Sequence, residues 1–342
     1  MSSSKIYARA FLTILLTLAI SGCASTTKIV SAITSKPIEV SALTGLPGRN
    51  GPVLAVKIDD TPPAHPQVGV EDADVVYIEQ VEGGLTRLLA IYSGKIPSRI
   101  GPVRSARISD IDILAQYGQV AFAFSGVQQK MLPVVASANL VDLSAMRQGP
   151  SIYANDPTRT PPTAMMLQAA LLMQQSLAKS LPIDSAKNMG WRFGKAPDTG
   201  TAIASVKMKW PANSYTATWS PLEKRWLLTH GAIPNLAESG KTLGPTTLVL
   251  QMVAITASIY HDKVGGITPF SATVGSGKGF ILRDGKSIPA IWSRPAATSG
   301  TTWSLATGEE ILFAPGQIWV ALLDTAPVFT PALASAPPSA SK

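Results

Sequence analysis

Cysteine and histidine are scarce in this sequence. One cysteine, Cys23, and three histidines, His65, His230 and His261, occur among 342 residues. A single thiol excludes an intramolecular disulfide and any site built from several thiolates. The histidines lack the spacing of a metalloprotease motif, and no Gly-x-Ser-x-Gly motif accompanies them. We therefore predict no metal site, no cofactor and no cysteine- or serine-based catalysis.

Long hydrophobic runs are also rare, and the clearest one lies at the N-terminus. Lys5 and Arg9 precede the apolar stretch 10–20, whose length of about 11 residues is too short for a membrane-spanning helix of roughly 20. A basic start, a short apolar core and small residues are typical of a secretory signal peptide. The string Ile20-Ser21-Gly22-Cys23 resembles the lipobox of bacterial lipoproteins. We predict that residues 1–22 are a signal peptide and that Cys23 is lipidated.

Charged residues make up only 15% of the chain, and positive charge is in excess. The net charge is +8, and removal of Lys5 and Arg9 with the signal peptide leaves +6 (8 − 2). Outside the cytoplasm, such a surplus favours anionic lipid headgroups or acidic wall polymers over nucleic acid. The alternative is that it serves only solubility.

Composition and hydrophobic patterning predict five segments in chain order. Residues 1–22 are the signal peptide, 23–42 a lipidated flexible tether, 43–185 an α+β domain, 190–325 a mostly β domain, and 326–342 a disordered Ala/Pro/Ser-rich tail. The fold class is therefore α+β, followed by a β-rich second domain. With 46% hydrophobic residues, the body can form a packed core without disulfides.

Hydrophobic patterns locate the elements of these domains. Strands are expected at 53–58, 75–81, 85–92, 120–124, 206–210, 215–219, 225–228, 247–255, 279–282, 290–292 and 318–323, and helices at 108–117 and 162–179. Gly83-Gly84 predicts a two-residue hairpin turn. That turn would pair Gln80 with Arg87, place Glu82 on the face of Arg87, and turn Glu79 to the opposite face.

Two strings in the first domain carry a family resemblance. They are Glu82-Gly83-Gly84-Leu85-Thr86-Arg87 and Gly101-Pro102-Val103-Arg104-Ser105-Ala106-Arg107. With Val274-Gly275-Ser276-Gly277-Lys278-Gly279 and Pro315-Gly316-Gln317-Ile318-Trp319 near the C-terminus, they resemble the YerB family of bacterial envelope lipoproteins over roughly 43–323. The resemblance implies a lipidated N-terminus, an α+β first domain and a β-rich second one, with no assigned reaction.

One departure from that family follows Arg159. Members tend to carry a Pro-His-Asn-like segment there, whereas this chain has Thr160-Pro161-Pro162-Thr163. If the family's chemistry depends on that histidine, this chain is impaired or only binds.

Charged residues of the two strings form the candidate ligand-binding site. The candidates are Asp59, Glu82, Arg87, Arg104, Ser105 and Arg107. Arginines beside the start of a helix are suited to hold an anionic or sugar-like ligand. The alternative is a structural network of ion pairs. Asp59 and Asp60, at a strand end, are expected to point in opposite directions, which argues against a shared metal.

The predicted function is binding. We expect a lipoprotein on the extracytoplasmic side of the cell membrane that binds an envelope glycan, an anionic polymer or a protein partner and contains no catalytic residues. One alternative is an envelope enzyme for glycan or phosphoester chemistry, with Glu82 or Asp59 as acid or base and Arg87, Arg104 and Arg107 orienting the substrate. Another is a structural scaffold.

Overall fold

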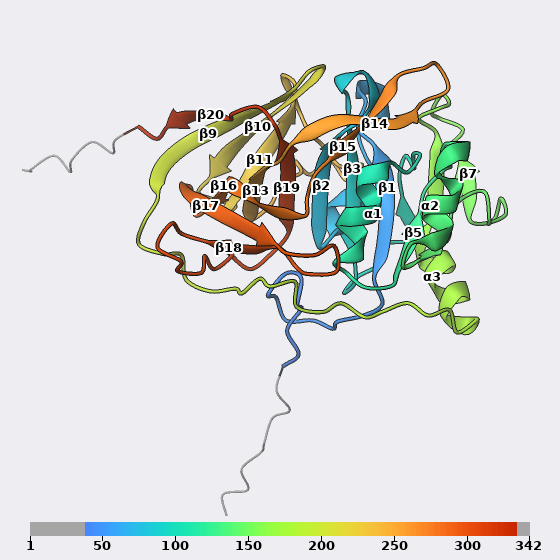
Figure 1. The fold of residues 1–342 in the computed structure, drawn as a ribbon, viewed down its shortest axis with the longest axis horizontal. Helices are drawn as coiled ribbons and strands as arrows, with labels where there is room; N and C mark the ends of the chain where they lie inside the picture. Colours follow the sequence, from blue (N-terminus) through green and yellow to red (C-terminus); the bar gives the residue numbers. More distant parts are fainter. Residues whose placement is uncertain (1–37, 334–342) are drawn as a thin grey trace, which may run out of the picture. The chain divides into compact units, whose positions relative to one another are not determined.

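The computed structural model describes residues 38–333. The predicted signal peptide, Cys23 and the tether up to residue 37 lie outside the described residues, as does 334–342. From Ile38 onward the chain forms one compact unit, and this unit is mostly β (Figure 1). Within 38–333, no helix combines the length and apolar character needed to cross a membrane.

Strands follow one another along most of the chain. Up to residue 168 they are β1 (Leu54–Asp59), β2 (Val75–Gln80), β3 (Thr86–Tyr92), β4 (Arg99–Ile100), β5 (Val120–Ala123), β6 (Leu140–Asp142), β7 (Tyr153–Asn155) and β8 (Met165–Gln168). Beyond residue 200 they are β9 (Thr201–Trp210), β10 (Asn213–Ser220), β11 (Arg225–His230), β12 (Ile233–Pro234), β13 (Thr247–Met252), β14 (Ile255–His261), β15 (Ile267–Ser271), β16 (Gly275–Arg283), β17 (Lys286–Arg294), β18 (Thr302–Ser304), β19 (Ile318–Leu323) and β20 (Val328–Pro331). The strands expected from the sequence are confirmed to within a few residues.

Helices are few and short. They are α1 (Ile108–Ala115), α2 (Leu132–Ser137) and α3 (Ala169–Ala178), with 3-10 turns at Pro62–Ala64, Val70–Asp72, Glu82–Gly84 and Gln129–Met131. The expected helix from Ile108 is confirmed. The one expected over 162–179 is wrong in its first half, because Met165–Gln168 is β8, which pairs with β4 and β7. Hydrophobic periodicity alone does not distinguish a short buried strand from a buried helical turn.

One large sheet contains strands from both halves of the chain. Its order is β12-β11-β10-β9-β17-β16-β13-β19-β2-β3-β1-β5-β6. The late strand β19 lies between β13 and β2 and runs parallel to both (Figure 1). All six residues of β19 are buried, as expected for a parallel strand covered on both faces. The two predicted domains are therefore joined by continuous strand pairing.

Both faces of this sheet are packed. In β1, Leu54, Val56 and Ile58 belong to one hydrophobic cluster, whereas Ala55, and Val53 just before the strand, belong to the other. Helix α1 packs against the second face through residues such as Ile113 and Leu114. The alternation of side chains along a strand thus sends neighbouring residues into two separate environments.

The hairpin between β2 and β3 differs from its expected geometry. The loop spans Val81–Leu85, with Glu82–Gly84 as a 3-10 turn, and the register pairs Glu79 with Arg87. Both glycines have positive φ, +68° at Gly83 and +72° at Gly84. A Cβ on Gly84 would lie 2.5 Å from a side-chain atom of Pro211. The prediction that Glu79 and Arg87 lie on opposite faces is therefore wrong, because the loop is longer than two residues.

Both predicted flexible ends include ordered residues. Ser41, in the predicted tether, is buried and its N–H donates to Leu46 O over 2.8 Å. In the predicted disordered tail, β20 pairs with β9, and Phe329 contacts Phe280 with 5.0 Å between ring centroids. The backbone of β9 provides hydrogen-bond partners for β20, and Phe280 provides an apolar contact for Phe329. The prediction of disorder is wrong for Val328–Pro331.

Candidate functional site

The end of β1 separates two sites. Asp59 and Asp60 are both almost fully buried. Asp59 lies on the sheet face covered by α1, where Oδ2 is 2.8 Å from Arg104 Nε. Asp60 turns to the other face, toward two histidines. The expectation that the two aspartates point in opposite directions is confirmed.

The residues predicted as a ligand site do come together on the Asp59 face. Glu82 forms an ion pair with Arg107, with Oε1 and Nε 2.6 Å apart, and also accepts a hydrogen bond from the hydroxyl of Thr268. The guanidinium of Arg87 donates to the carbonyl of Ser105 over 2.8 Å. Together with the Arg104–Asp59 pair, these contacts give each predicted charge a partner inside the protein. This arrangement favours the ion-pair network over the open ligand site.

Electrostatics on this face fit that interpretation. Burial raises the pKa of Glu82, but the hydrogen bond and charge of Arg107 outweigh it and hold the pKa below its ordinary value. The pKa of Arg87 falls to about 9 because burial and the neighbouring charges of Arg107 and Arg104 penalise the cation. Glu82 is therefore ionised and paired, which makes it a poor general acid.

A buried ion cluster that the sequence analysis missed lies beside this network. Lys57 on β1 contacts Glu79 on β2, and its Nζ is 2.8 Å from Asp110 Oδ1 on α1. All three side chains are fully buried. Burial and the negative charge of Asp110 raise the pKa of Glu79 to about 8. The raised pKa favours the protonated form of Glu79 beside Lys57 and Asp110.

The Asp60 face has a different chemistry, built from neutral donors. The carboxylate of Asp60 accepts hydrogen bonds from Tyr215 Oη (2.5 Å), from Gln67 Nε2 (3.1 Å) and from the hydroxyl of Thr86. These donors come from β10, from the loop after β1 and from β3. A buried carboxylate held by several donors can remain ionised without a paired cation.

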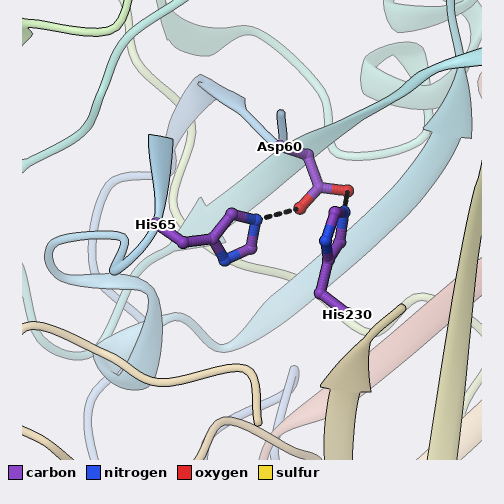
Figure 2. A group of neighbouring side chains, drawn as sticks. All are labelled: Asp60, His65 and His230. Atoms are coloured by element: carbon purple, nitrogen blue, oxygen red, sulfur yellow. Dashed lines mark ion pairs between the residues drawn. The ribbon is translucent and has the colours of Figure 1, made fainter. Parts of the chain in front are cut away.

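Two histidines complete this group. His65 Nε2 lies 3.3 Å from Asp60 Oδ1, and His230 Nε2 lies 3.8 Å from Asp60 Oδ2. Figure 2 shows both imidazoles directed at the one carboxylate. The two rings contact each other with centroids 4.5 Å apart. Asp60, His65 and His230 each offer one ligand atom, and these atoms lie within 4.8 Å of one another.

The pKa values of the two imidazoles are shifted in opposite directions. Burial lowers the pKa of His65, but hydrogen bonding to Asp60 and its charge outweigh this and raise it. The pKa of His230 is lowered, first by burial and further by the charge of His65. The pKa of Asp60 is lowered, because the hydrogen bond of His65 and the charges of both histidines outweigh its burial. His230 Nε2 is buried and has no hydrogen-bond partner, so it is free to take a proton or a ligand.

Long-range contacts hold His65 in place. Its Nδ1 lies 3.0 Å from Asn235 Oδ1. The guanidinium of Arg159 donates to the carbonyls of Ala64 (3.0 Å) and Pro66 (2.7 Å), on either side of the histidine. Arg159, which precedes the missing Pro-His-Asn-like segment, thus supports the loop that carries His65.

A cavity of about 650 Å³ opens at the Asp60 group. Its lining includes Asp60, Pro62, His65, Leu85, Lys207, Lys209, Trp210, Pro211, Ala212, Asn213, Ser214, His230, Gly231, Ala232, Ile233 and Pro234. Lys207 and Lys209 are exposed residues of β9, so they add positive charge beside largely apolar walls. None of the six residues predicted from the sequence lines this cavity. The volume is in the range of small-molecule sites.

Comparison with known families shows which family this chain belongs to. The family model described as "Protein of unknown function (DUF3048) N-terminal domain" matches residues 43–182, and the model for the C-terminal domain of that family matches 206–320. The chain belongs to this family. The family-level resemblance noted in the sequence is confirmed by a relative of the same kind.

That relative is the protein named "Putative lipoprotein YerB" from Bacillus subtilis (strain 168). It is 24% identical over 285 residues, which cover 78% of this chain and 80% of the relative. The crystal structure of YerB from Bacillus subtilis matches with a TM-score of 0.72 at 19% identity, covering 85% of this chain and 99% of the other. The two-part family architecture and the fold are thus shared.

The histidine group could not be predicted from local motifs, because its members are far apart in the chain. His65 and His230 lie in different halves, and a search for local metal-binding spacing does not join them. One local signal was present, since Asp60 and His65 flank the same short segment after β1. His261, the third histidine, ends β14 and is exposed, outside the group.

Proposed function

We propose that this protein is a lipid-anchored, extracytoplasmic binding protein that takes an anionic glycan chain into the cavity beside Asp60. The observation that carries the proposal is the cavity itself, with Lys207 and Lys209 exposed at its lining and a preorganised polar group formed by Asp60, His65 and His230. Lysines suit phosphate or carboxylate groups, while apolar residues such as Pro211 contact the carbon faces of sugar rings.

The proposed ligand site is the cavity and not the cluster of Arg87, Arg104 and Arg107, called here the arginine cluster. Arg87 and Arg107 are mostly buried and occupied by Ser105 and Glu82. A ligand binding there would have to break these contacts, at the cost of leaving Glu82 unpaired. The lysines of the cavity have no ion-pair partner among the described residues. Free cations beside a cavity support binding there.

The test is titration calorimetry on residues 38–342, the compact unit, with oligomers of glycerol phosphate, oligouronic acid and neutral N-acetylglucosamine. We expect an anionic oligomer to bind and the neutral one to bind more weakly. The double substitution Lys207→Ala/Lys209→Ala should weaken binding by about tenfold or more, since each lost charge contact contributes on the order of 1 kcal/mol.

The matched control is Lys278→Ala, an exposed lysine on β16 outside the cavity. Its affinity should equal that of the unmodified protein, and added salt should weaken binding for both. Equal affinity in the double variant and the control, or no binding of either anionic oligomer, would refute the proposed ligand site.

The anchor is tested separately at Cys23. Cell fractionation should find the full chain in the membrane and a Cys23→Ser variant released from it, because the proposed lipid attachment requires the thiol. Membrane retention of Cys23→Ser would overturn the anchoring proposal without affecting the cavity.

A further inference from the structure

The three ligand atoms beside the cavity have the composition of a metal site. Two imidazole nitrogens and one carboxylate oxygen converge from the end of β1, the loop after it and the end of β11. Sets of two histidines and one carboxylate bind divalent transition metals and leave further positions open. Among the described residues, no further acid, histidine or thiol joins these three as a fourth ligand.

The spacing of these atoms suits a small divalent ion. Zn²⁺ binds nitrogen and oxygen ligands at about 2.0–2.2 Å, which separates the ligand atoms of a tetrahedron by about 3.3 Å. The Nε2 atom of His65 is 3.3 Å from Asp60 Oδ1, and that of His230 is 3.8 Å from Asp60 Oδ2. These two distances run to different oxygens of the carboxylate, and the three ligand atoms lie within 4.8 Å of one another, so the side chains must draw together to hold one ion.

Outer contacts orient the ligands as metal sites require. Asn235 Oδ1, 3.0 Å from His65 Nδ1, accepts its hydrogen and leaves Nε2 of that ring to face the group. Tyr215, Gln67 and Thr86 donate to Asp60, which leaves about one of the four acceptor positions of its carboxylate, on Oδ2, for an ion. Asn213 Nδ2 lies 3.4 Å from that oxygen and is the contact that an ion would displace. Of the three ligand atoms, His230 Nε2 is buried and has no hydrogen-bond partner.

We infer that Asp60, His65 and His230 form a binding site for a divalent transition metal, with zinc as its first candidate. All three residues line the cavity, so the open coordination position of the ion faces the space in which we place the anionic ligand. The inference deepens the proposed function and rests on it for that last role, whereas metal binding itself is independent of any ligand.

The experiment measures metal alone. Residues 38–342, stripped with a chelator and dialysed against Zn²⁺, should retain one zinc per chain by elemental analysis. Co²⁺ added to the stripped protein should produce the intense visible absorption of a tetrahedral site. His230→Gln should weaken zinc binding by about 100-fold or more, since even outer-shell changes cost 10–100-fold.

His261→Gln is the matched control, because this exposed histidine lies outside the group; it should bind zinc as the unmodified protein does. Circular dichroism and thermal unfolding of the stripped variants establish that each is folded, and His65→Gln provides a second ligand variant. Substoichiometric zinc together with no Co²⁺ spectrum, or unchanged binding in folded His230→Gln and His65→Gln, would overturn the site.

The two proposals fail separately. The variant Lys207→Ala/Lys209→Ala should bind zinc normally, because neither lysine belongs to the metal group. Zinc binding without binding of any anionic oligomer would refute only the proposed function. Binding of an anionic oligomer by a protein that takes up no zinc would refute only the metal site.

Discussion

The two faces of the sheet at the end of β1 use neighbouring aspartates in different ways. On the Asp59 face, arginines, lysine and acids pair with one another beneath α1 and β15. On the Asp60 face, a tyrosine, an amide and a hydroxyl hold the carboxylate, and two histidines stand beside an open cavity. Charge density alone therefore does not locate a binding site. The paired charges of the Asp59 face stabilise the fold. The less charged Asp60 face has the unpartnered His230 Nε2 and the cavity.

The largest expected loss of stability is on the Asp59 face. Lys57→Met removes the only cation that contacts Glu79 and Asp110 in the buried cluster. Loss of one partner from a buried ionic group typically costs about 3–5 kcal/mol, and urea unfolding should show a decrease of that size. A surface variant, Lys278→Met, should change stability by less than about 0.5 kcal/mol. A loss below about 1 kcal/mol in Lys57→Met would contradict the structural role of this cluster.

A smaller effect is expected for Arg107→Ala. It removes the ion pair with Glu82, and hydrogen bonds to charged groups contribute about 1.5–3 kcal/mol, so we expect unfolding free energy to fall by about 2 kcal/mol with unchanged binding in the cavity. Arg104→Ala should cost less, since Arg104 is 25% exposed and solvent screens its pair with Asp59. If both variants kept full stability but lost ligand binding, the arginine cluster would be the binding site.

On the Asp60 face, Tyr215→Phe should cost about 1.5 kcal/mol, the lower end of the range for a hydrogen bond to a charged group, because Gln67 and Thr86 still donate to Asp60. The variant removes the hydroxyl that donates to Asp60 over 2.5 Å and leaves the ring in place. Thermal or urea unfolding measures the loss, with Tyr260→Phe on β14 as the control. A cost as large as that of Lys57→Met would mean that the two faces contribute equally to stability.

The smallest effect, measured near pH 5, is expected for Glu79→Gln. The pKa of Glu79 is raised from 4.5 to about 8, so the native state keeps a proton that the unfolded chain releases between these values. The stability from this proton is complete below pH 4.5 and is lost as the pH rises through about 8. Gln mimics the protonated acid and releases no proton on unfolding, so the variant should lie within about 1 kcal/mol of the unmodified protein near pH 5 and be the more stable of the two at pH 7.

Urea unfolding of both proteins at pH 5, 7 and 9 checks this expectation. The unmodified protein should lose stability relative to Glu79→Gln as the pH rises across the series. The reverse trend would mean that Glu79 is ionised in the folded protein and that Lys57 is paired with two carboxylates.

Much of the fold could be predicted from local patterns. The strands at β1, β2, β3 and β19 follow from apolar runs, and the start of α1 follows from the loop that precedes Ile108. The six candidate residues, Asp59 to Arg107, were also correctly grouped by the expected hairpin and loop. Their pairing could not be predicted, because it depends on a hairpin register one residue away from the expected one and on Thr268 from a distant strand.

What the sequence by itself determined is local: the signal-peptide pattern before Cys23, the alternation that sends Asp59 and Asp60 to opposite faces, and the family motifs. Tertiary structure decided which of those faces is closed and which is open. His230 reaches Asp60 only because β19 joins the two halves in one sheet and because side chains of β10 and β11, which do not pair with β1, meet the residue that follows β1. Periodicity depends on neighbours along the chain, whereas a site formed by distant residues depends on the order of strands, which no local pattern encodes.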